Sequence, residues 1–316
     1  MKKLLILSLI FLVLLSACTQ SNSQKQSDKK ETIKIGYLPI THSANLMMTQ
    51  QIQQQTKNVN YNLELVRFNN WPDLMDALNS GKIDGASTLI ELAMKSKEKG
   101  SNIKAVALGH HEGNVIMGQN NETISDFHNH EDYSFAIPHR YSTHYLLLEE
   151  MRKQLHLDSD TFSYHEMAPA EMPAALSENR ISGYSVAEPF GALGEKLGKG
   201  HTLKHGSDVV PDAYCCALVL REDLINQHHH TAQAFMTDYK KAGYKMNNKK
   251  QSVEVMSKHF KQDKKVLKQS ADWTSYGDLT IEKEGYNKIT HLVKEHKLFN
   301  TPDYKDFVDP TLYKEG

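Results

Sequence analysis

The chain has 316 residues, of which 39% are hydrophobic and 24% are charged, and this composition excludes a disordered protein and a polytopic membrane protein. Its 37 lysines and arginines nearly balance its 38 aspartates and glutamates, so the formal net charge is −1 and no nucleic-acid partner is expected. The length fits two domains of ordinary size better than one small core.

The N-terminus predicts export and attachment to a lipid. Two lysines at positions 2 and 3 precede an apolar run, Leu4 to Leu15, and Cys18 follows a Ser-Ala pair. The run is shorter than the roughly 20 apolar residues that a membrane-spanning helix needs. The segment resembles a bacterial lipobox, which implies that residues 1–17 are a signal peptide and that Cys18 carries the lipid. We therefore expect the protein on the extracytoplasmic face of the cell membrane, held to the bilayer through Cys18.

Residues 18–31 are polar and lack apolar periodicity, which predicts a flexible linker. From Thr32 onward, strands and helices are expected to alternate. The predicted strands are Thr32–Leu38, Tyr61–Phe68, Ile83–Thr88 and Ile103–Gly109, and the predicted helices are Ala44–Gln55, Trp71–Ser80 and Leu89–Glu98. This order favours a parallel or mostly parallel sheet with helices on its faces.

A second series of the same kind follows. Asn114–Gln119 is expected to be a strand that leads into a polar turn, where we place the first crossing between two lobes. The further strands are Tyr133–Pro138, Phe162–Met167 and Ile181–Val186, and the helices are Tyr145–Leu155, Met172–Asn179 and Phe190–Leu197.

An internal repeat supports two similar lobes. Leu74–Ser87 aligns with Met172–Ser185, each residue matching one 98 positions later. The identical pairs include Leu78 with Leu176, Ile83 with Ile181, Gly85 with Gly183 and Ser87 with Ser185. Two similar lobes indicate a cleft between them.

Asp212–Leu220 is an apolar run that we interpret as the strand returning to the first lobe. It contains Cys215 and Cys216, whose side chains should point to opposite faces of a strand, so buried thiols are expected in place of a disulfide. Mostly helical sequence follows, and the tail from Asp303 is expected to strap over the first lobe. Lobe 1 is thus predicted to be residues 32–119 plus 213–316, and lobe 2 residues 120–212.

The loops at the C-terminal ends of the predicted strands carry the candidate ligand-binding residues, because ligands of open α/β folds collect there. These loops are rich in hydroxyl and imidazole groups and contain one arginine and one glutamate. The candidates are Thr41, His42, Ser43, Ser87, Thr88, His110, Arg140, Ser142, Thr143, His144 and Glu188.

Hydroxyl-rich helix N-termini suit a small oxyanion, and Arg140 could add a bidentate fork. Each serine or threonine could instead be a plain N-cap, and Arg140 could be a surface residue or pair with Glu188. Glu188 could cap the following helix, contact a cationic group of a ligand, or contact the opposite lobe.

Neither a metal site nor a cofactor is predicted. The histidine runs at 110–111 and 228–230 do not have zinc-ligand spacing, and no HExxH motif occurs. The sequence also lacks a nucleophile elbow, a Walker loop and a dinucleotide fingerprint, so we do not expect an enzyme.

Four features together carry a family resemblance: the lipobox, GYLPITHSANL at 36–46, MPAALSENRISGYSVAEPFGA at 172–192 and DAYCCALVLRED at 212–223. With them the chain resembles the lipid-anchored solute-binding proteins of ABC importers in the nitrate, taurine and alkanesulfonate group, from Thr32 to about Val266. The resemblance implies an α/β fold of the type II periplasmic-binding class, with two lobes, two crossover strands, a ligand cleft and hinge closure. It also implies a monomer that captures a small anionic solute, such as an aliphatic sulfonate, taurine or nitrate, and delivers it to ABC permease subunits.

Three alternatives stay open. The protein could bind a thiamine-pyrimidine precursor, or it could be an enzyme like the pyrimidine-synthesising relatives, which use histidine as a reagent. It could also be a surface adhesin or a metal-scavenging lipoprotein. Intact mass with a pyridoxal cofactor and the metal content of the purified protein discriminate among them.

Overall fold

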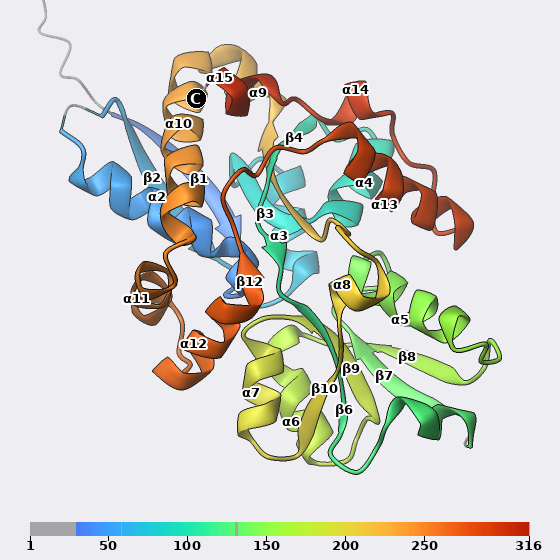
Figure 1. Cartoon of the computed structure of the whole chain (residues 1–316). Helices are drawn as coiled ribbons and strands as arrows, with labels where there is room; N and C mark the ends of the chain where they lie inside the picture. The colour runs from blue at the N-terminus through green and yellow to red at the C-terminus, as the bar shows by residue number, and fades with distance from the viewer. Residues whose placement is uncertain (1–29, 58, 130–131, 316) are drawn as a thin grey trace, which may run out of the picture. The chain divides into compact units, whose positions relative to one another are not determined.

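Two five-stranded mixed sheets organise the computed structural model, which describes residues 30–57, 59–129 and 132–315 (Figure 1). The predicted signal peptide, Cys18 and nearly all of the predicted linker lie outside the described residues. No helix within the described ranges has both the length and the apolar character needed to cross a bilayer.

The first sheet has the strand order β2-β1-β3-β11-β4. Strand β1 is parallel to β2 and β3, whereas β11 runs antiparallel to β3 and β4. The strands are β1 (Glu31–Tyr37), β2 (Tyr61–Arg67), β3 (Gly85–Leu89), β4 (Ile103–Leu108) and β11 (Cys216–Arg221).

The second sheet repeats this plan with the order β10-β6-β9-β7-β8. Strand β7 is parallel to β8 and β9, whereas β6 runs antiparallel to β9 and β10. The strands are β6 (Asn114–Gln119), β7 (Tyr133–Ile137), β8 (Phe162–Glu166), β9 (Gly183–Ala187) and β10 (Gly200–His205).

The internal repeat of the sequence therefore corresponds to a repeat of the fold. Strands β3 and β9 are the central strands of the two sheets, and each begins with a glycine of the repeat, Gly85 and Gly183. A Cβ at Gly85 would lie 2.6 Å from the carbonyl oxygen of Val219, and one at Gly183 would lie 2.5 Å from that of Met117. The neighbouring strand thus requires glycine at the same place in both lobes.

The crossing between the sheets comes earlier than predicted. The sequence analysis assigned residues 114–119 to the first lobe, but β6 pairs with β9 and β10 of the second sheet. The chain therefore crosses between Leu108 and Asn114, where β5 (His111–Glu112) pairs with β12 (Thr274–Ser275). Strand β11 lies in the first sheet, in keeping with a return crossing before it.

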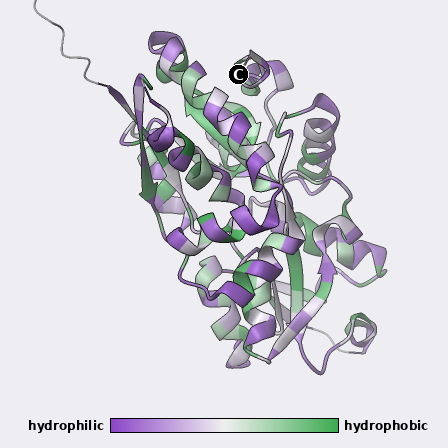
Figure 2. Cartoon of the chain, turned by 60° about the vertical axis from the view of Figure 1, so that its left-hand side comes forward, coloured by the Kyte–Doolittle hydropathy of each residue, from purple (hydrophilic) through white to green (hydrophobic). Residues whose placement is uncertain are grey.

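Helices flank both sheets, and the central strands are buried on both faces. Every residue of β3 and β9 is buried, as expected of central strands between two layers of helices. Figure 2 shows hydrophobic residues concentrated on the strands and hydrophilic ones on many helix surfaces. The helices between β1 and β4 are the 3-10 helix η1 (Thr41–Ser43), α2 (Ala44–Gln55), α3 (Trp71–Asn79) and α4 (Ile90–Glu98).

The helices that follow β6 accompany the second sheet, and those after β11 belong to the C-terminal segment (Figure 1). The former are η2 (Ile124–His128), α5 (Thr143–Gln154), η3 (Pro169–Glu171), α6 (Met172–Ser177), α7 (Phe190–Lys196) and α8 (Gly206–Val209). The latter are α9 (Glu222–Gln227), α10 (His229–Met246), α11 (Lys249–His259), α12 (Lys264–Trp273), α13 (Lys283–Glu295), α14 (Tyr304–Phe307) and α15 (Thr311–Glu315).

The C-terminal segment returns to the first sheet, as expected. A parallel bridge joins Val308 to Ala105 of β4, and α15 packs against α10. In Figure 1 this red segment lies beside β4 and α10. Helix α12 instead packs against α7, so it links the C-terminal segment to the second lobe.

Candidate functional site

Four buried imidazole and thiol side chains meet where the chain passes between the two sheets. His42 lies in η1 after β1, and His110 follows β4. Cys216 is the first residue of β11, and Cys215 directly precedes it. Each is at most 4% exposed, and one ligand atom from each lies within 4.8 Å of those of the others. We call these four residues the His–Cys group.

Three atoms of the His–Cys group form a compact triangle. Nδ1 of His42 lies 3.3 Å from Sγ of Cys216 and 3.7 Å from Sγ of Cys215. The two sulfur atoms are 3.8 Å apart, and both cysteines are free thiols.

The sequence analysis predicted no metal site and expected the two thiols on opposite faces of a strand, and the structure corrects this geometry. Strand β11 begins at Cys216, so Cys215 lies before it and the alternation of strand side chains does not apply. The four potential ligands come from three segments that are far apart in the sequence. A search for local zinc-ligand spacing therefore misses them.

The second lobe adds His144 and Thr143, at the start of α5, to the surroundings of the His–Cys group. Nε2 of His144 lies 3.5 Å from Sγ of Cys215, and its Nδ1 lies 3.4 Å from the hydroxyl of Ser185 in β9. The group is thus approached from both sheets. Ser185 escaped the sequence analysis although it pairs with Ser87 in the internal repeat.

A hydrogen-bonded relay joins the lobes beside His144. Oγ1 of Thr143 lies 2.5 Å from Oε1 of Glu91 and 2.6 Å from the carbonyl oxygen of Tyr214. A hydroxyl has one proton, so both short contacts are satisfied when protonated Glu91 donates to Thr143 and Thr143 donates to Tyr214. Burial raises the pKa of Glu91 to about 8, which agrees with a protonated carboxyl.

The histidines of the site are neutral at physiological pH. Burial lowers the pKa of His42 far below its ordinary value and lowers the pKa of His110 and of His144 to about 3. Burial likewise raises the pKa of the Cys215 thiol. No lysine or arginine is among the described groups that perturb these pKa values. The site therefore offers neutral donors and lone pairs, and none of the described groups that act on these pKa values is a side-chain cation.

Several buried polar atoms at the site lack a hydrogen-bond partner among the described residues. They are Nε2 of His42, Nε2 of His110, Oε2 of Glu91 and Oδ1 of Asn114. Unpaired buried polar atoms cost free energy and usually find a partner, so four of them in one place indicate a site that a ligand completes.

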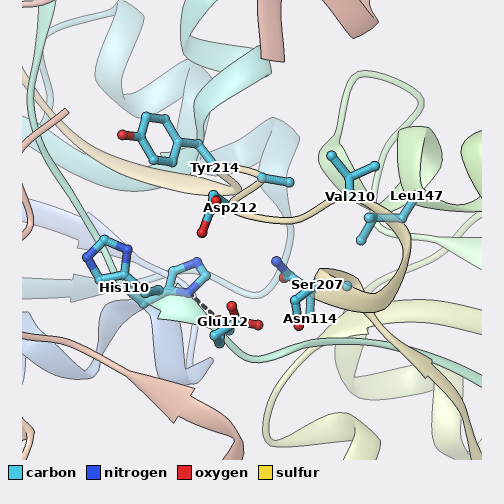
Figure 3. Close-up of a pocket in the computed structure, with 11 residues that line it drawn as sticks. His110, Glu112, Asn114, Leu147, Ser207, Val210, Asp212 and Tyr214 are labelled. Carbon is cyan, nitrogen blue, oxygen red and sulfur yellow. Dashed lines mark hydrogen bonds between the residues drawn. The ribbon is translucent and has the colours of Figure 1, made fainter. Parts of the chain in front are cut away.

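A small pocket adjoins the His–Cys group. It has a volume of about 50 Å³, and Figure 3 shows His110, Asn114 and Tyr214 among its lining residues. The dashed line in Figure 3 marks the 2.5 Å hydrogen bond between Nδ1 of His110 and the carbonyl oxygen of Glu112. A pocket of this size admits an ion or a water molecule.

A larger pocket, of about 320 Å³, opens between the loops of the two lobes. Leu38, Ile40 and Arg67 line it from the first lobe, and Pro169 and Phe190 line it from the second. The segment after β1 therefore lines this pocket with Leu38 and Ile40 and supplies His42 to the His–Cys group.

Ser43 and Ser87, both candidate ligand-binding residues, lie beside His42 of the His–Cys group. The hydroxyl of Ser43 donates to that of Ser87 at 3.2 Å, and the hydroxyl of Ser87 donates to the carbonyl oxygen of His42. Thr88 points elsewhere, because its hydroxyl contacts Sδ of Met75.

Thr41 and Ser142 are satisfied within the protein. The backbone N–H of Thr41 donates to the carbonyl oxygen of Glu188, and its hydroxyl accepts a hydrogen bond from Thr274. The hydroxyl of Ser142 accepts from the backbone N–H of Tyr145 and is the N-cap of α5, the alternative that the sequence analysis left open.

Arg140 does not reach the site. It is exposed, and its guanidinium lies 4.1 Å from the ring centre of Tyr145. Its backbone N–H, not its side chain, bonds to Glu166. The structure therefore favours the surface alternative over an anion-binding fork.

Glu188 is buried and bridges two helices. Its carboxylate accepts from the backbone N–H of Ala192 in α7 and from the hydroxyl of Ser270 in α12. Burial raises the pKa of Glu188 to about 7. Of the three roles considered for Glu188, its hydrogen bonds support helix capping at α7 and contact with the opposite lobe, to which Ser270 of α12 was predicted to belong.

Comparisons with known proteins agree on one family. The model of the NMT1-like family matches residues 26–258. The ligand-binding component of an ABC-type import system from Staphylococcus aureus, solved with zinc bound, is 73% identical, with a TM-score of 0.89 over 90% of this chain and 98% of that chain.

Two more distant structures share the fold. The periplasmic nitrate-binding protein NrtA from Synechocystis PCC 6803 is 18% identical, with a TM-score of 0.79 over 91% of this chain and 88% of that chain. The aliphatic sulphonate binding protein SsuA from Escherichia coli is 18% identical, with a TM-score of 0.71 over 88% of this chain and 92% of that chain. These similarities confirm the predicted two-lobed type II periplasmic-binding fold.

Among curated sequences, the bicarbonate transport ATP-binding protein CmpC from Synechococcus elongatus is 22% identical over 226 residues. The match takes in 66% of this chain and 34% of that protein, so the chain spans about a third of the length of the curated relatives it matches.

Proposed function

Since the chain belongs to the NMT1-like family, we propose that it is the solute-binding component of an ABC-type importer, which captures a small solute and delivers it to permease subunits. The 73% identical Staphylococcus aureus protein is such a ligand-binding component. In this proposal the protein acts as a monomer and not as an enzyme, and the lipid on Cys18 holds it outside the cell membrane.

One observation carries the proposal: side chains from both lobes meet in one buried site with unpaired polar atoms. His144 and Thr143 of α5 approach Cys215 and Glu91 of the first lobe within hydrogen-bonding distance. A ligand held between these groups stabilises the closed arrangement of the lobes, and a permease can recognise that arrangement.

The solute proposed is a small oxyanion, such as a sulfonate, taurine or nitrate. Nitrate, sulphonate and bicarbonate appear in the names of the relatives, and all three are small oxyanions. In this chain the anion would be met by backbone N–H donors such as those at the N-terminus of α5, because the hydroxyls of Ser43 and Ser87 donate within the protein and Arg140 lies on the surface.

Calorimetric titration of the purified protein with taurine, alkanesulfonates, nitrate, bicarbonate and thiamine-pyrimidine precursors tests the proposal. We expect at least one oxyanion to bind and to raise the melting temperature. The matched variants are Arg140→Ala, which should leave the affinity within about twofold, and Thr143→Val, which should weaken it about tenfold or more.

Two results would contradict the proposal. Absence of binding to every compound of the series would reject an oxyanion-binding role. Loss of binding in Arg140→Ala together with unchanged binding in Thr143→Val would place the ligand outside the buried site. Because the Staphylococcus aureus relative was solved with zinc bound, the titrations are run on metal-free and on zinc-loaded protein.

A further inference from the structure

We infer that the His–Cys group is a binding site for a transition-metal ion of the Zn²⁺ class. The inference rests on the proposed function, because the ion would lie in the same cleft as the solute. It goes further in assigning ligand residues and a chemical class to the site.

The donor set suits such an ion. Two thiolates and two imidazoles are a common ligand set for Zn²⁺, and soft thiolate donors disfavour Mg²⁺ and Ca²⁺, which require oxygen. All four residues of the group are at most 4% exposed, so water does not compete for the ion from the protein surface. A surface patch of histidines would remain exposed to water.

The spacing of the donors matches tetrahedral coordination. With Zn–S bonds of about 2.3 Å and Zn–N bonds of about 2.0–2.1 Å, two sulfurs of a tetrahedron lie roughly 3.8 Å apart and a sulfur and a nitrogen roughly 3.6 Å apart. The two sulfurs are 3.8 Å apart, and Nδ1 of His42 lies 3.3 Å from one and 3.7 Å from the other. One face of a tetrahedron is therefore already formed.

A backbone carbonyl holds the His110 ring in the tautomer that metal ligation needs. Nδ1 of His110 bonds to the carbonyl oxygen of Glu112 at 2.5 Å, which leaves Nε2 as the free lone pair. Metal-bound histidines typically donate their second N–H to such a carbonyl.

For His110 to be the fourth ligand of a tetrahedral ion, its imidazole ring must rotate. The rings of His42 and His110 are stacked, with centres 3.2 Å apart and planes 8° from parallel, so an ion in the plane of one ring is out of the plane of the other. Rotation of the His110 side chain brings Nε2 toward the ion. Nε2 of His144, in the second lobe, lies 3.5 Å from Sγ of Cys215. His144 would therefore contact a metal-bound Cys215 when the lobes close.

Charge and protons balance in this scheme. Zn²⁺ displaces one proton from each thiol, both protons leave to solvent, and the ion with two thiolates and two neutral imidazoles has no net charge. A neutral complex is the form that a buried site without side-chain cations can accommodate. All four ligands belong to the first-lobe side of the cleft, so we expect the ion to bind without lobe closure.

Metal analysis of the purified protein tests the inference. The protein is stripped with a chelator, incubated with Zn²⁺ alone, passed over a desalting column and analysed by inductively coupled plasma mass spectrometry. We expect about one zinc per chain and, after loading with Co²⁺, the strong visible bands of tetrahedral cobalt with a thiolate-to-cobalt charge-transfer band.

Matched variants separate this site from adventitious binding. Cys215→Ser and Cys216→Ser should each lower zinc affinity about 100-fold or more and remove the charge-transfer band, while melting curves report folding. The control replaces His229 and His230, which are exposed, by alanine and should bind zinc as the wild type does. No zinc in the wild type, or equal zinc in the serine variants, would overturn the inference.

The two proposals fail separately. Oxyanion binding by chelator-treated protein that takes up no zinc would overturn the metal site and leave the solute-binding function in place. Zinc binding with no response to any solute would support the metal site and contradict the oxyanion proposal.

Discussion

The buried carboxyl of Glu188 should make the stability of the protein depend on pH. Burial holds its pKa near 7, against an ordinary value of 4.5, while the hydrogen bonds from Ser270 and Ala192 oppose this shift. A carboxyl whose pKa is raised by folding stabilises the native state fully below pH 4.5, where both states hold the proton. That contribution is lost as the pH rises toward 7, because the unfolded chain ionises first.

The size of the effect follows from the two pKa values. Between pH 5 and pH 8 the free energy of unfolding should fall by about 2.5 kcal/mol through Glu188, at about 1.4 kcal/mol for each pKa unit. Glutamine cannot ionise, so Glu188→Gln should remove this slope. Glu91, whose pKa is raised to about 8, adds a slope of the same sign in both proteins and cancels from their difference.

Urea unfolding at pH 5, 6, 7 and 8, followed by circular dichroism and tryptophan fluorescence, measures this difference. Glu178→Gln is the matched control, because the Glu178 side chain is 62% exposed and pairs with Arg180 on the surface. We expect wild type and Glu178→Gln to lose stability in parallel and Glu188→Gln to lose about 2.5 kcal/mol less. Equal slopes for all three proteins would refute the argument.

Three further predictions concern packing, the relay and the metal. Gly183→Ala should destabilise the protein by about 1–3 kcal/mol in urea unfolding, because the new Cβ would lie 2.5 Å from the carbonyl oxygen of Met117; an unchanged midpoint would contradict the register of the second sheet. Thr143→Val should break the relay from Glu91 to Tyr214 at a cost of about 1–3 kcal/mol, and small-angle scattering should show a more open protein, whereas unchanged scattering would deny the relay a role in closure. Zinc at 100 times its Kd should raise the free energy of unfolding by about 2.7 kcal/mol and a chelator should reverse this, whereas equal stability with and without zinc would contradict specific binding.

Much of the fold could be predicted from the sequence because it depends on local patterns. Helix α2 has the predicted bounds, and the strands with clean alternation or apolar runs lie within two residues of their predicted starts as far as β9. The repeat around Gly85 and Gly183 indicates two similar lobes from the sequence alone. Local periodicity and a repeated backbone requirement are both readable from one sequence.

Elements that depend on neighbours were missed or misplaced. Strand β10 is a half-buried edge strand of polar residues, so it has no periodic signal, and only its pairing with β6 defines it. Strand β6 was assigned to the wrong lobe because hydrogen-bond partners, not its own sequence, decide which sheet it joins. The helical sequence expected after β11 is interrupted at His228, which separates α9 from α10.

The site was predicted in part. His42, His110, Thr143 and His144 lie in loops or helix starts after strands, where the rule for α/β folds directs attention. The pairing of two distant histidines with Cys215 and Cys216 could not be derived from spacing, since it requires the positions of three separate segments. The adjacent cysteines of the family motif were the one sequence signal for the group.

A crystal structure of the protein purified with its natural ligand, with anomalous data at the zinc edge, locates both the solute and the metal. We expect ligand density between His144 and the His–Cys group, with an anomalous peak within about 2.3 Å of the sulfurs of Cys215 and Cys216. Ligand density confined to the pocket lined by Arg67 and Phe190, with no peak beside the thiols, would contradict this expectation.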